Sequence, residues 1–104
     1  MVRAVMTTNE QIAELVALAQ EDNAFWEDIK ARELEIEKWV AAAEQQGLDV
    51  YDRDLVIDPP TMPTLVMMVL DLVNRRYGPE HNLDTGSFIL GIRLAAREEL
   101  GLPI

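Results

Sequence analysis

The stretch Met-Pro-Thr-Leu-Val-Met-Met-Val-Leu-Asp-Leu-Val at residues 62–73 decides the fold, because it is apolar almost throughout. Pro63 is tolerated in the first turn of a helix, and Gly78-Pro79 ends that helix after Tyr77. On a helix the apolar residues form three adjacent rows, made of Met62, Val66, Val69 and Val73, of Leu65, Met68 and Leu72, and of Met67 and Leu70. An ordinary surface helix carries one apolar stripe only a little over about 100° wide, so we predict that this helix is enclosed on most sides.

Two arrangements would enclose such a helix. It is the central helix of a four-helix domain, covered by the other three helices, or part of it contacts a second copy or another protein through its adaptable Met side chains. A chain of 104 residues has few helices with which to cover every side, and this keeps the second arrangement open.

Hydrophobic periodicity and capping residues predict three further helices. The first begins near Asn9, and a shift of its apolar stripe by about one residue predicts a break or kink near residues 21–24. The second helix ends at about Gln46, and the last one runs from an N-cap at Asp84 to Leu100. We therefore expect an all-α domain of four helices, in which the first two are separate or form one kinked rod.

Composition bounds the class of protein. With 104 residues, 49% of them hydrophobic and 27% charged, the chain suits one domain spanning residues 1–104. Nine basic against nineteen acidic residues give a net charge of -10, which argues against direct nucleic-acid binding. The sequence has no Cys, no signal-peptide pattern and no apolar run long enough to span a membrane, so we expect a cytoplasmic protein.

The acidity is concentrated ahead of the apolar helix. Residues 1–58 hold five basic and fourteen acidic groups, whereas residues 59–104 hold four and five. Residues 48–60 mix Asp with apolar residues and end in Pro59-Pro60, which predicts an irregular acidic connector. We expect the acidic surface to consist of Glu33, Glu35, Glu37, Glu44, Asp49, Asp52, Asp54 and Asp58.

The sequence offers little for catalysis or metal binding. His81 is the only histidine, so a His pair that could hold a transition metal is missing. Asp52, Asp54 and Asp58 have part of a calcium-loop spacing, but Ile57 replaces the required Gly. We expect no enzyme activity, no metal and no cofactor.

Two short resemblances fall at the start of the last helix. Asp84-Thr85-Gly86-Ser87 resembles the active-site string of aspartic proteases, which hold it in loops between β-strands; here a helical stripe follows, and we expect Asp84 to be a helix N-cap. Residues 86–94 are similar to the segment around the modified Ser of acyl and peptidyl carrier proteins, with Gly86 in place of the usual Asp or His. That similarity implies, as a remote alternative, a carrier-like domain with phosphopantetheine on Ser87.

The function that the pattern favours is non-catalytic protein binding, by self-association or with a partner protein. In the last helix Leu90 and Leu94 lie opposite the core stripe and beside two arginines, as in a partner surface. The predicted interface consists of Met67, Met68, Leu70, Leu90, Arg93, Leu94 and Arg97. The alternative is an acidic inhibitor that imitates nucleic acid, such as a phage-encoded antagonist of a host enzyme, using the acidic surface named above.

Overall fold

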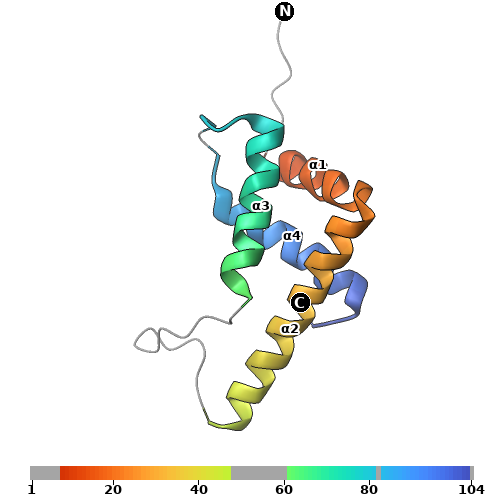
Figure 1. Ribbon diagram of the computed structural model, residues 1–104, viewed down its shortest axis with the longest axis vertical. Helices are drawn as coiled ribbons and strands as arrows, with labels where there is room; N and C mark the ends of the chain where they lie inside the picture. The colour runs from red at the N-terminus through yellow and green to blue at the C-terminus, as the bar shows by residue number, and fades with distance from the viewer. Residues whose placement is uncertain (1–7, 48–60, 82, 104) are drawn as a thin grey trace, which may run out of the picture.

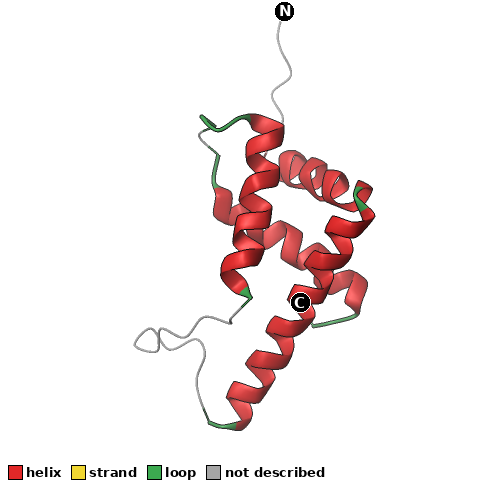
Figure 2. Cartoon of the chain, viewed as in Figure 1, coloured by secondary structure: helices red, strands yellow, loops and turns green. Residues whose placement is uncertain are grey.

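The computed structural model describes residues 8–47, 61–81 and 83–103, and these contain four α-helices and no strand (Figure 1). The helices are α1 (Thr8–Glu21), α2 (Asn23–Gln45), α3 (Met62–Tyr77) and α4 (Thr85–Leu100). In Figure 2 the helices are red and the described loops and turns are green. The prediction of an all-α, four-helix architecture is confirmed. The predicted connector at residues 48–60 lies outside the described residues.

A single residue, Asp22, separates α1 from α2. Its side-chain carboxylate accepts a hydrogen bond from the backbone N–H of Phe25 at 3.2 Å, which satisfies one of the free donors at the start of α2. The two helices run in different directions from this point (Figure 1).

Local signals set the ends of α3 and α4. Gly78 follows α3 with φ +85° and donates its N–H to the carbonyl of Asn74 at 2.8 Å. Asp84 caps α4: its carboxylate accepts from the N–H of Gly86 at 3.1 Å and from the hydroxyl of Ser87 at 2.9 Å. Gly101 ends α4 in the left-handed conformation. The predicted N-cap at Asp84 is therefore confirmed.

The core forms around α4, which packs against each of the other three helices. Its buried residues Phe88, Ile92 and Ala96 recur every four positions and face the centre of the domain. The buried core residues of the other helices are Leu15, Ala19, Trp26, Ile29, Ile36, Leu65, Val69 and Val73. At the crossing of α1 and α4, Gly91 leaves so little space that a Cβ atom there would clash with the Cγ2 methyl of Ile12.

The apolar helix α3 is not completely enclosed within the described part of this chain. It packs against all three other helices, but its buried residues Leu65, Val69 and Val73 lie on a single stripe. On the opposite side Met67 is 64% exposed. The other Met, Leu and Val residues of α3 are buried or half-buried, so among the described residues complete cover by the three other helices fails at Met67 alone, and there the second arrangement stays open.

Candidate functional site

A buried glutamate joins α2 to α4. Glu33 of α2 has no exposed surface, and its two carboxylate oxygens accept hydrogen bonds from Nε and Nη2 of Arg93 at 2.8 and 3.0 Å. Nη1 of Arg97 donates to the same carboxylate at 3.1 Å. Such a bidentate, charge-assisted arrangement fixes the relative orientation of the two helices as well as compensating the buried charge.

The placement of Glu33 on the acidic surface is therefore wrong. Glu33 lies four residues after Ile29 and three before Ile36, so it shares the buried stripe of α2. It can occupy that position because the two arginines of α4 reach it from the side. The sequence predicts Arg93 and Arg97 as interface residues. Their guanidinium groups, however, bind a carboxylate of their own chain.

Arg97 makes further contacts that hold the end of the described chain. Its Nη1 forms an ion pair with Glu37 at 2.9 Å, and its Nε and Nη2 both donate to the carbonyl oxygen of Pro103, at 2.8 and 2.6 Å. Burial lowers the pKa of Arg97, but hydrogen bonds and charge attraction from Glu37 and Glu33 outweigh it, so the pKa lies above its usual value. Arg97 thus connects α2, α4 and the segment after α4.

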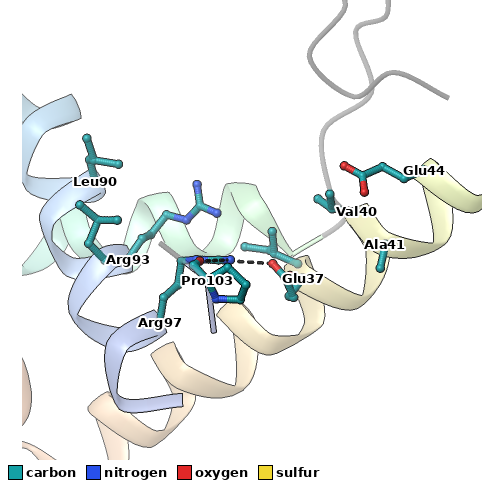
Figure 3. A pocket seen from close by; sticks show the side chains of 10 residues that line it. Glu37, Val40, Ala41, Glu44, Leu90, Arg93, Arg97 and Pro103 are labelled. Carbon is teal, nitrogen blue, oxygen red and sulfur yellow. Dashed lines mark hydrogen bonds and ion pairs between the residues drawn. The ribbon is translucent and has the colours of Figure 1, made fainter. Parts of the chain in front are cut away.

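Above this ion cluster lies a groove of about 440 Å³ between α2 and α4 (Figure 3). On the α2 side, Glu37, Val40, Ala41 and Glu44 line it along two helical turns (Figure 3). The full lining comprises Ile36, Glu37, Val40, Ala41, Glu44, Leu90, Arg93, Leu94, Arg97 and Pro103. The groove therefore combines an apolar surface with carboxylates on one side and bound guanidinium groups below.

Four of the seven predicted interface residues come together in this groove, and all four belong to α4: Leu90, Arg93, Leu94 and Arg97. Leu90 is 56% exposed. The other three predicted residues lie on α3 and do not line the groove, and of these Met68 and Leu70 are half-buried. At the groove, the α4 half of the predicted interface therefore lies beside α2, whereas the prediction grouped it with residues of α3.

The predicted acidic surface is divided. Glu35 and Glu44 are exposed, and Glu37 is half-buried by its ion pair with Arg97. Asp49, Asp52, Asp54 and Asp58 lie outside the described residues.

Outside the groove, the described residues that the sequence suggested for metal binding or chemistry are held in structural contacts. Within it, no group of three His, Asp or Glu side chains is arranged to hold a metal ion. His81 makes a 3.0 Å hydrogen bond with the side-chain oxygen of Asn74, and Ser87 is bound to the helix cap. None of the described helices combines the length and the apolarity that crossing a membrane requires.

Sequence reasoning assigned Glu33, Glu37 and Glu44 to an acidic surface, missed Val40 and Ala41, and did not place α2 beside the predicted interface residues of α4. One signal was present: Arg93 and Arg97 are four residues apart on one helix, so both can reach the same carboxylate, and Glu33 interrupts an otherwise apolar stripe. Which helix faced these arginines depended on how the helices pack.

No protein-family model, curated protein or solved structure matches this chain.

Proposed function

We propose that the protein is a non-catalytic protein-binding module and that the groove between α2 and α4 is its contact surface. The observation that carries this proposal is Leu90, a large apolar side chain that is 56% exposed at the edge of the groove. Beside it, Leu94 and Val40 extend the apolar surface across the groove. Leucines that a monomer leaves exposed next to a groove gain free energy when a partner covers them.

The ion cluster beneath the groove supports the same proposal. Glu33 holds both arginines of α4, so the two helices that form the sides are fixed relative to each other without a ligand. A preformed surface has less conformational entropy to lose on binding, which favours affinity.

The chain provides a matched pair of variants to test this function. Leu90 and Met67 are both large, apolar and more than half exposed, but only Leu90 lines the groove. The wild-type protein, Leu90→Asp and Met67→Asp would each be tethered through the N-terminus and exposed to an extract of the cells that naturally make the protein. Bound proteins would be quantified by mass spectrometry, and sedimentation velocity would report self-association.

We expect Leu90→Asp to weaken binding of a partner or self-association by more than about tenfold, because a charge replaces an apolar contact that the partner would bury, while Met67→Asp retains it. Circular dichroism checks that both variants stay helical. The proposal is wrong if the wild type is a monomer that captures nothing, or if Leu90→Asp binds the same proteins as the wild type.

The acidic-inhibitor alternative stays a prediction, supported by the net charge of -10 and by the exposed carboxylates Glu35 and Glu44. It predicts binding to a basic partner that weakens steeply with salt and is insensitive to Leu90→Asp. The carrier-like alternative also stays a prediction. Intact mass after incubation with a phosphopantetheinyl transferase and coenzyme A tests it, because only a modified Ser87 would add mass.

A further inference from the structure

The charges in and beneath the groove are not balanced. Two carboxylates, of Glu37 and Glu44, and two guanidinium groups, of Arg93 and Arg97, line the groove, and the buried Glu33 beneath it adds a third carboxylate. Those two cations already bind Glu33, and Arg97 also binds Glu37 and a backbone carbonyl. Among the described residues the exposed carboxylate of Glu44 has no ion-pair partner. The groove therefore offers acceptors to a cation and few free donors to an anion.

The dimensions of the groove suit a helix. The lining residues on α2 run from 36 to 44 and those on α4 from 90 to 97, so at 1.5 Å per residue each side is roughly 10–12 Å long. That length corresponds to about two turns, which is the spacing of the apolar anchors of an amphipathic helix that binds in a groove. Leu90 on one side and Val40 and Ala41 on the other provide apolar contacts (Figure 3), and Leu94 of α4 also lines the groove.

We propose that the groove binds a basic amphipathic helix of a partner protein. This inference rests on the proposed function. Its apolar face packs on Leu90 and Leu94, and a Lys or Arg at the edge of that face pairs with Glu44. The net charge of -10 attracts a basic partner over a longer range. A second copy of this chain is the less favourable occupant, because it carries the same net charge and is repelled.

Nuclear magnetic resonance titration with defined peptides tests the chemistry of the partner. The probes are three synthetic peptides of about 18 residues, long enough to form a helix when bound. One is an amphipathic Leu/Lys helix, the second replaces every Lys by Glu, and the third has the Leu/Lys composition in scrambled order. Each is added to isotope-labelled full-length protein, and the backbone amide shifts report both affinity and position.

We expect the Leu/Lys helix to bind at least about tenfold more tightly than either other peptide, a difference that apolar and charge contacts together readily supply. The amides that shift most are expected at Val40, Ala41, Leu90 and Leu94. Glu44→Gln should weaken the Leu/Lys helix by about two- to fivefold, as for one exposed ion pair, and Met67→Asp should leave its affinity unchanged. The matched Leu90→Asp variant should weaken it more than about tenfold.

This inference would be overturned by equal binding of the scrambled peptide, by tighter binding of the Leu/Glu peptide, or by amide shifts located away from the groove. Groove amides that shift with the protein's own concentration would identify a second copy as the occupant, and would also overturn it. If Leu90→Asp abolishes capture of a natural partner while the Leu/Lys helix fails to bind, the proposed function stands and only the chemistry assigned to the partner is wrong.

Discussion

Two glutamates connect α2 and α4, and they do so in opposite surroundings. Glu33 is fully buried and receives its hydrogen bonds from two arginines. Glu99 has a side chain that is 42% exposed, and it accepts hydrogen bonds from the indole N–H of Trp26 at 2.7 Å and the amide of Gln20 at 3.1 Å. Both cross-link helices, but water can replace the partners of Glu99 and cannot reach Glu33. The difference teaches that burial, more than the number of bonds, decides what such a contact contributes to stability.

The largest effect is expected when Glu33 loses a partner. Arg93→Met keeps most of the side-chain volume but removes both hydrogen bonds that Arg93 donates to the buried carboxylate. The free energy of unfolding should fall by about 3 kcal/mol, because an incompletely compensated charge stays buried. Urea unfolding followed by circular dichroism measures the change.

A double variant separates lost bonds from buried charge. Glu33→Met combined with Arg93→Met removes the carboxylate together with its main partner and should recover most of the stability that Arg93→Met loses. If the double variant is as unstable as the single one, the cost comes from packing and not from the uncompensated charge.

A packing change on another face of α4 gives a reference against which the effects at Glu33 and Glu99 can be compared. Gly91→Ala places a methyl group against the Cγ2 of Ile12, and this overpacking should outweigh the higher helix propensity of Ala, for a net loss of about 1 kcal/mol. Thermal and urea unfolding measure it. In an Ile12→Ala background the clash is gone, so Gly91→Ala should become neutral or stabilising. A loss in that background as large as in the wild type would contradict the close approach of α1 and α4.

Removing the charge of the exposed glutamate should have a smaller effect. Glu99→Gln keeps an oxygen acceptor for the indole of Trp26 but loses the ion pair with Lys30, whose Nζ lies 3.7 Å from Oε1. We expect a loss of about 0.5 kcal/mol, because exposed ion pairs are weak and water solvates the groups that are released. A loss as large as that of Arg93→Met would contradict the comparison.

High salt should distinguish the contacts of Glu99 from those of Glu33, and this salt dependence is the smallest of the expected effects. Raising NaCl to about 1 M shortens the Debye length to roughly 3 Å, so the destabilisation caused by Glu99→Gln should shrink toward zero. The destabilisation caused by Arg93→Met should persist, because mobile ions do not reach the buried carboxylate. Urea unfolding of both variants at low and high salt measures this difference.

The helix ends could be predicted from the sequence because their causes are local. Pro63 in a first turn, Gly78 after α3 and Asp84 before α4 each act on backbone groups within a few residues. The same holds for the ion pair of Asp28 with Arg32, whose i, i+4 spacing is set by one helix.

The candidate site could be predicted only in part. The exposed position of Leu90 followed from its place opposite the core stripe of its own helix. Glu33 was placed on the wrong surface and Val40 was missed as a site residue, because their roles depend on which face of α2 meets α4. The periodicity of one helix identifies its buried side but not the helix that covers it. The same gap explains why the sequence alone leaves open what covers each side of α3, which is apolar on most sides.

The hydrogen bonds from Arg97 to the carbonyl oxygen of Pro103 affect where a tag can be attached to this protein. Pro103 lines the groove, so an affinity tag or fluorescent label fused behind it would begin beside the proposed binding surface. Such a fusion would compete with a partner for access to the groove and would disturb the hydrogen bonds between Pro103 and Arg97, whose side chain also forms an ion pair with Glu37 of α2.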